Sequence, residues 1–296
     1  MPNRRPVAES LQEYARGVGG GLLFSLPLFY TMEMWEIGMT ASPGRLAALV
    51  GGTFALLVAY NRVAGIHGTH RLRDDLLESV EEMGLGLAVA AVLLAILGRF
   101  PAGGLSPDAL GVLTVQAMVA AVGVSVGTAQ LGESPDDNEA EDEPGSEAAG
   151  SEAPGDEAAG ETRAAPRTVG GEVIIALCGA VLVASNVSPT EEIVLLGTEL
   201  SAAHLAALVA LSLGVGGGLL YVSAFRGSDR FARAGLGPLR GTVVTYAVAL
   251  VAAAALLWVF GHVEAATVAG GLGPLVVLSF PAMLGASAGR LLLGSP

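Results

Sequence analysis

Eight stretches of mainly apolar residues, each long enough to cross a bilayer, dominate this chain of 296 residues. A membrane-spanning helix needs about 20 such residues. The stretches lie at 17–36, 44–64, 80–99, 108–131, 170–188, 202–225, 238–261 and 265–292. Inside a bilayer only helices and closed barrels satisfy every backbone hydrogen bond, and runs of this length are helical. We therefore predict an all-α, polytopic membrane protein with eight transmembrane helices.

The composition excludes several other classes of protein. Charged residues make up 15% of the chain, against about 25% in soluble domains, and the mean hydropathy is +0.61. A soluble enzyme, a nucleic-acid binder and a disulfide scaffold are all excluded, the last because Cys178 is the single cysteine. The sequence contains no Walker, HExxH or GxSxG motif, and its four histidines lack metal-ligand spacing. We therefore predict no enzymatic activity, no cofactor and no metal site, with the lipid bilayer as the main partner.

The arginines define an orientation in the membrane. All 15 basic residues are Arg, and an N-terminus inside the cell places 13 of them on the cytoplasmic side. Only Arg45 and Arg99 then lie outside, which agrees with the positive-inside rule. We predict a multi-pass protein of the cell membrane with both termini in the cytoplasm. The lack of Lys beside 28 acidic residues is typical of a halophilic microbial source.

The two halves of the chain carry similar sequences at a nearly constant spacing. Residues 31–50, TMEMWEIGMTASPGRLAALV, match residues 190–209, TEEIVLLGTELSAAHLAALV, at nine of 20 positions. This offset is 159, and it becomes 162 where SVGTAQLG at 125–132 matches SAGRLLLG at 287–294. Because four spans are an even number, both halves cross the membrane in the same direction. We predict two parallel four-helix repeats, related by a pseudo-twofold axis along the membrane normal.

An acidic segment separates the two repeats. Residues 133–168 hold 12 acids, two Arg and many Pro, Gly and Ser residues. Such a segment cannot bury enough apolar surface to offset the entropy lost on ordering. We therefore divide the chain into a first repeat at 1–132, a disordered cytoplasmic linker at 133–168 and a second repeat at 169–296.

Two glutamates occupy matching places near the predicted outer ends of the repeats. Glu33 and Glu192 each follow a threonine by two positions, Thr31 and Thr190. Facing the pseudo-axis, the two carboxylates would share a proton or hold a cation between oxygen ligands, to which the hydroxyls add. The alternative is that both carboxylates reach water at the level of the lipid headgroups.

A break in the fifth span adds weaker candidates to the same path. The sequence SPTEE, at 188–192, has the pattern of a capping box, with Pro189 at the first helical position. It predicts that one helix ends near 186–188 and a short helix begins at Pro189, and Pro27 lies at a comparable point in the first half. Interrupted helices at matching positions of two repeats are typical of transport sites. The weaker candidates are Glu36, Glu191, Asn186 and Ser188, and simple helix capping is the alternative for Glu191.

A run of acids from Asp74 to Glu82 leads into the third span. Glu82 is the deepest of them. We interpret this run as an amphipathic approach to the membrane, because residues 241–245, the corresponding region of the second half, contain no acid.

The stretch LLFSLPLFYTMEMWEIGM, at 22–39, carries a resemblance to a known family, together with Asn61–Arg62 and Asp74–Asp75. In these residues the chain resembles an uncharacterised prokaryotic, haloarchaeal-type family of integral membrane proteins, a domain of unknown function. TMEMW, at 31–35, is the most distinctive part. The resemblance implies a polytopic membrane protein, and it implies no substrate and no site residue.

Two functions fit these features. The first is transport or conduction of a small solute, with a cation or proton as one candidate, along the pseudo-twofold axis. The alternative is a non-catalytic membrane scaffold, or a subunit of a larger membrane complex, with a homo-oligomer or another membrane subunit as its partner. A transporter should need Glu33 and Glu192, whereas a scaffold should not.

Overall fold

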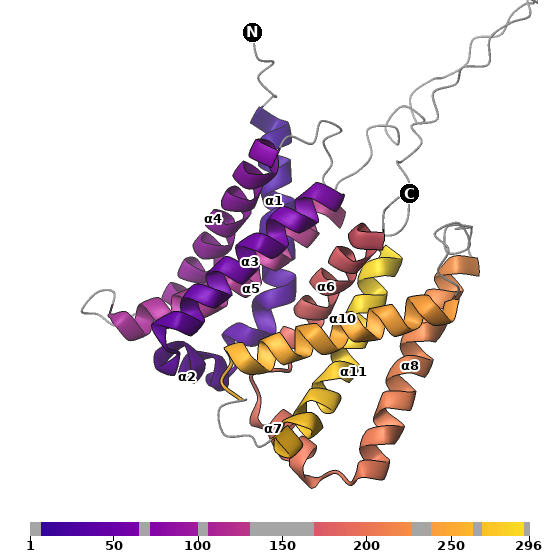
Figure 1. Cartoon of the computed structure of the whole chain (residues 1–296). Coiled ribbons are helices and arrows are strands. Elements are labelled where there is room, and N and C mark those ends of the chain that lie inside the picture. The colour runs from indigo at the N-terminus through magenta and orange to yellow at the C-terminus, as the bar shows by residue number, and fades with distance from the viewer. Residues whose placement is uncertain are drawn as a thin grey trace, which may run out of the picture.

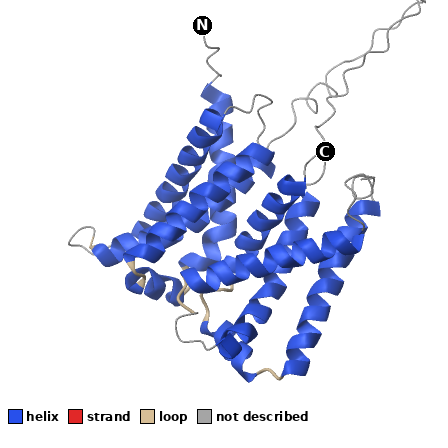
Figure 2. Ribbon diagram, in the orientation of Figure 1, coloured by secondary structure: helices blue, strands red, loops and turns tan. Residues whose placement is uncertain are grey.

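Helices form all of the regular structure in the part of the chain that the computed structural model describes (Figure 2). These residues are 7–64, 72–99, 106–130, 169–225, 238–262 and 268–292. The predicted linker at 133–168 lies outside them. The all-helical prediction is therefore confirmed for the described ranges.

Each half of the chain runs through its helices in the same order, with one short helix in second place. The first half contains α1 (Val7–Phe29), α2 (Met32–Thr40), α3 (Pro43–Ala64), α4 (Leu72–Ile96) and α5 (Pro107–Gln130). The second half contains α6 (Val169–Ser185), α7 (Glu191–Glu199), α8 (Ala202–Phe225), α10 (Pro238–Val259) and α11 (Val268–Leu292). The start of α1 and the end of α11 lie at one end of the molecule, and the short helices α2 and α7 lie at the other (Figure 1).

Six of the described helices are long and apolar enough to cross a membrane. They are α3, α4, α5, α8, α10 and α11. Helix α6 is apolar but has only 17 residues. Helix α1 has 23 residues, and its first half carries Glu9, Glu13 and Arg16. The protein is thus a multi-pass helical membrane protein, and the count of clear spans is six rather than the predicted eight.

The predicted first span at 17–36 is wrong as a single helix. Helix α1 ends at Phe29, and Thr31 is extended before α2 begins at Met32. Two side chains cap the carbonyls that this break leaves free: the Thr31 hydroxyl donates to Pro27 O at 2.8 Å, and Gln116 Nε2 of α5 donates to Leu28 O at 3.0 Å. An apolar pattern alone does not locate this end, because one of the two caps comes from a distant helix.

The predicted break in the fifth span is confirmed. Helix α6 ends at Ser185, and α7 begins at Glu191 instead of at Pro189. Thr190 precedes α7 as its N-cap, without a side-chain capping bond, so the capping box itself does not form. The Thr190 hydroxyl instead donates to Val187 O at 2.9 Å.

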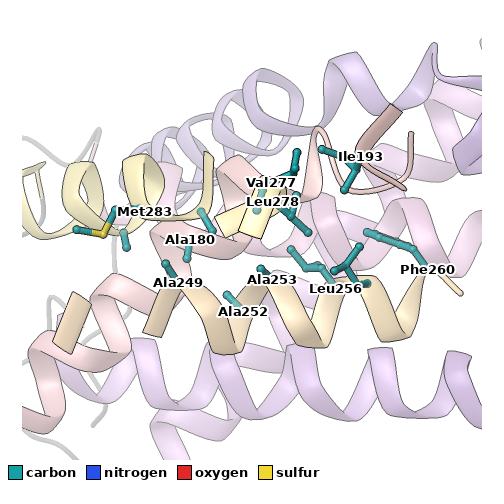
Figure 3. Packing of buried hydrophobic residues seen from close by; sticks show 14 of the residues in the cluster. Ala180, Ile193, Ala249, Ala252, Ala253, Leu256, Phe260, Val277, Leu278 and Met283 are labelled. Atoms are coloured by element: carbon teal, nitrogen blue, oxygen red, sulfur yellow. The ribbon is translucent and has the colours of Figure 1, made fainter. Parts of the chain in front are cut away.

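Helices α5 and α11 are the central helices of their halves. Helix α5 packs against α1, α2, α3 and α4, and α11 packs in the same way against α6, α7, α8 and α10. Alanine and other small side chains of α6 and α10 face the larger side chains of α11 in the core, among them Ala180, Ala249, Ala253, Val277 and Met283 (Figure 3). Small residues let membrane helices approach closely, and close packing stabilises helix pairs within lipid.

Glycines make two helix crossings possible in each half. In α1, a Cβ on Gly20 would meet the backbone of Gly123 and Gly127 in α5. In α6, a Cβ on Gly179 would meet the backbone of Gly285 and Gly289 in α11. The short helices follow suit, with Gly38 against Gly111 and Val112, and Gly197 against Gly273 and Pro274. The partners differ by 159 residues on α1 and α2, and by 162 residues on α5.

The contacts between the halves are not those of a twofold axis. Helix α6 packs against α3 and α5 of the first half. A twofold axis would pair α8 with α1 in the same manner, yet in the described ranges these two helices form no comparable contact, and α8 lies at the far edge of the molecule (Figure 1). The predicted pseudo-twofold relation is therefore wrong, because an isologous interface uses the same surface on both partners and this interface does not.

Candidate functional site

The most deeply buried acid network lies where α3, α4 and α5 meet. Glu82 of α4 is 5% exposed, and Asn61 of α3 donates to its Oε2 at 2.9 Å. Ser79 of α4 and Ser125 of α5 complete a group that we call the Glu82 cluster. All four side chains are buried, in the interior of helices that are otherwise apolar.

Hydrogen-bond directions in the Glu82 cluster orient its amide. The Ser79 hydroxyl donates to Asp75 O at 2.7 Å, so its oxygen accepts a proton from Asn61 Nδ2 at 3.2 Å. The second proton on Nδ2 then goes to Glu82. The Ser125 hydroxyl is 3.3 Å from Asn61 Oδ1, which has no hydrogen to donate. Both protons on Asn61 Nδ2 are therefore used, one of them on Glu82.

The chain folds this way because polar residues share one stripe of α4. Asp75, Ser79 and Glu82 are spaced by four and three residues, which places them on one face. The same buried stripe continues as Gly86, Val89, Ala90 and Leu94. Its polar half lies at the end of the molecule where α3 and α5 end, and its apolar half lies deeper along α4.

A second polar cluster occupies the same end of the other half. Arg290 of α11, whose side chain is 7% exposed, forms an ion pair with Glu172 of α6 at 2.6 Å. Arg290 Nη1 also donates to the Thr245 hydroxyl of α10 at 2.6 Å. Val169, Ala176 and Val248 line a small hollow beside these three residues. Here a cation and a carboxylate are buried together, which lowers the cost of each charge.

The two clusters stand at corresponding positions. Helices α4 and α10 both end on a glycine with positive φ, Gly98 at +68° and Gly261 at +89°, which are 163 residues apart. The same spacing relates Glu82 to Thr245. Ser125 and Ser287, on α5 and α11, are 162 residues apart and both buried. One half thus has a carboxylate where the other has a threonine bound to an ion pair.

The sequence-predicted carboxylates lie at the opposite end of the molecule, on the short helices. Glu33 is half-buried in the first turn of α2, and Glu192 is exposed in the first turn of α7. In the described part of the chain no hydrogen bond or ion pair joins them. Thr31 and Thr190 turn their hydroxyls back onto helix carbonyls, at Pro27 and Val187. Glu36 and Glu191 are exposed.

The two weaker polar candidates lie inside the break between α6 and α7. Asn186 Nδ2 donates to Leu182 O at 2.7 Å and to Phe24 O of α1 at 3.2 Å, so this amide joins the two halves. The Ser188 hydroxyl is fully buried, with no hydrogen-bond partner among the described residues. These residues close the interrupted helix, and the contacts that they make are structural.

Sequence reasoning noted Glu82 and set it aside, since the second half carries no acid in the matching region. The signal that was available is the buried spacing of Asp75, Ser79 and Glu82, followed by an apolar helix. Across the described ranges, no group of three or more His, Cys, Asp or Glu side chains gathers that could hold a metal ion.

Comparison with known families covers nearly the whole chain. Residues 13–293 match the sequence model of a family described as "Putative integral membrane protein (DUF2391)". No curated protein and no solved structure matches the chain. The family description agrees with the apolar helices, and it carries no substrate, partner or reaction.

Proposed function

Because the chain belongs to the DUF2391 family of integral membrane proteins, we propose that it is an eight-span transport protein in which Glu82 binds a proton or a small cation. The proposed spans are the six long apolar helices together with α6 and the apolar part of α1. Each of these last two helices is continued by a short helix, α2 or α7, at the same end of the molecule.

The case for two parallel repeats comes from three kinds of correspondence. The nine-residue helices α2 and α7 both follow an extended threonine, 159 residues apart. Helices α3 and α8 share a first-turn bond, in which Ser42 caps the Arg45 amide and Ser201 caps the His204 amide. The glycine crossings of α1 with α5 recur in α6 with α11. These repeats are arranged head to tail, without a twofold axis.

The transport role rests on one observation, the burial of Glu82. Its hydrogen-bond partners within the described residues, Asn61 and Ser125, are uncharged, and Glu78 and Glu81 on the same helix are like charges. An ionised carboxylate inside an apolar helix bundle is costly unless it is neutralised. In the second half the same place is neutralised by an internal ion pair. At Glu82 a transported proton or cation would do this work, with the oxygens of Ser125 and Ser79 beside it.

The orientation proposed for the chain places both clusters toward the cytoplasm. Thirteen of 15 arginines then lie on that side, in keeping with the positive-inside rule. Arg99, one of the two on the other side, stacks over the Trp35 ring with its guanidinium carbon 3.5 Å from the ring centroid. Such a pair suits the membrane–water interface, where aromatic rings gather.

A flux assay tests this function. The purified full chain is reconstituted into liposomes, and proton, sodium and potassium fluxes are followed under an imposed gradient of each ion. Glu82→Gln should reduce the flux at least tenfold. Glu81→Gln, an exposed neighbour on α4, is the matched control and should leave the flux unchanged.

The same assay separates the alternatives. Equal flux through wild-type and Glu82→Gln protein would overturn the role of Glu82. If Glu33→Gln or Glu192→Gln abolished the flux and Glu82→Gln did not, the carboxylate pair predicted from sequence would replace it. No flux of any tested ion above empty liposomes would favour the scaffold.

A further inference from the structure

The first and second halves meet through an apolar interface between α3 and α6. Leu57 and Tyr60 of α3 are each 1% exposed, and they share a cluster with Ile175, Cys178 and Leu182 of α6. A stripe of α6 is thus covered by a stripe of α3, within one chain.

The corresponding stripe of α1 is uncovered. The residues of α6 on this stripe are Cys178, Leu182, Ser185 and Pro189, and all four are buried. Their counterparts, 159 residues earlier, are Gly19, Leu23, Leu26 and Tyr30. Leu23 is 71% exposed against 4% for Leu182, and Tyr30 is 64% exposed. A Cβ on Gly19 would meet nothing within 4 Å. We call these four residues the α1 stripe.

A difference in helix rotation does not explain this contrast. The neighbouring face of each helix is buried in the same way, with Gly20 and Gly21 of α1 corresponding to Gly179 and Ala180 of α6. Both glycine crossings point to the central helix of their own half. The α1 stripe therefore faces the direction in which α6 meets α3, and no helix of this chain packs there within the described ranges.

The covering surface is also present a second time, at the other edge of the molecule. Helix α8 corresponds to α3, and its Val215 and Leu219 stand where α3 has Leu56 and Tyr60. Val215 is 38% exposed and Leu219 is half-buried, whereas Leu56 is half-buried and Tyr60 is 1% exposed. Helix α8 lies at the edge of the second half, away from α1 (Figure 1).

We propose that a second copy of this chain packs its α8 against the α1 stripe, repeating between chains the contact that α3 makes with α6 inside one chain. The proposal rests on the correspondence of the two halves proposed above, and it does not depend on transport. A heterologous contact of this kind closes into a ring when its rotation allows. Lipid alone is the other occupant of the stripe. The copy is favoured because the same pair of surfaces is already complementary within the chain, and because the open space at Gly19 admits a close helix.

Disulfide cross-linking in membranes tests the contact. Two differently tagged chains, both with Cys178→Ala, are produced together, one carrying Leu23→Cys and the other Val215→Cys. Oxidation should join the two tags, and neither substitution alone should join two copies. Val251→Cys in place of Val215→Cys is the matched control, because Val251 is 64% exposed on a different face of the second half. We expect at least tenfold more joined product with Val215→Cys than with this control.

A mass measurement in lipid nanodiscs gives a second readout. Wild-type protein should have the mass of two or more chains. Leu23→Trp should lower it to that of one chain, while Val251→Trp should not. A single-chain mass for the wild type, or equal cross-linking at Val215 and Val251, would assign the stripe to lipid and overturn the proposal. Because these readouts report packing alone, they can fail while Glu82-dependent flux survives, and the reverse also holds.

Discussion

A single methyl group at Gly20 should force α1 away from α5. A Cβ at this position would lie 2.5 Å from the Gly123 carbonyl oxygen and 2.9 Å from the Gly127 nitrogen. Both are backbone atoms, so no side-chain rotation relieves the contact, and one helix must shift. Overpacking of this kind costs about 1–3 kcal/mol.

The matched control is Gly84→Ala, since a Cβ at Gly84 in α4 would meet nothing within 4 Å. Both changes carry the same gain in helix propensity, about 0.5–1 kcal/mol, which cancels in the comparison. The free energy of unfolding of Gly20→Ala should therefore lie about 1–3 kcal/mol below that of Gly84→Ala.

Unfolding in mixed micelles of a mild detergent and sodium dodecyl sulfate, followed by helical circular dichroism, measures this difference. Gly179→Ala should behave like Gly20→Ala, because its Cβ would meet the backbone of Gly285. A difference under about 0.5 kcal/mol, the range of ordinary surface substitutions, would refute the close crossing.

Three further outcomes follow from the structure. Arg290→Met should destabilise the protein by about 2 kcal/mol or more, because it leaves Glu172 without its cation, and the double variant Arg290→Met/Glu172→Met should recover part of that loss in the same unfolding assay. Cys178, 1% exposed, should resist a membrane-permeant maleimide in the folded protein and react after unfolding, and equal labelling in both states would contradict its burial. Replacing residues 134–165 with a Gly/Ser chain of equal length should leave the circular dichroism and the midpoint of unfolding unchanged, as expected of a tether, and loss of folded protein would mean that the segment packs.

The sequence by itself determined the class of the protein, because each apolar segment carries its own signal. About 20 apolar residues must form a helix in a bilayer whatever surrounds them. The break at 186–188 was also readable, from a proline beside polar residues. The matching strings at 31–50 and 190–209 located the two short helices, and both have nine residues in the structure.

Only the tertiary structure decided which residues meet. Glu82 is one acid in a run of five within 74–82, and its burial depends on Asn61 and Ser125, which lie 21 residues before it and 43 after it in the chain. The end of α1 depends on Gln116, which is 88 residues from Leu28. Such bonds join helices whose spacing in the sequence carries no information about their contact.

The arrangement of the halves was beyond the sequence for a related reason. Equal sequences with an even number of spans require only that both halves cross the membrane in the same direction, and they leave the rotation between the halves free. Leu23 and Leu182 are the same residue type at matching positions, yet one is 71% exposed and the other 4%. That difference depends on which helix stands beside each one, and therefore on packing between the halves, which local sequence does not encode.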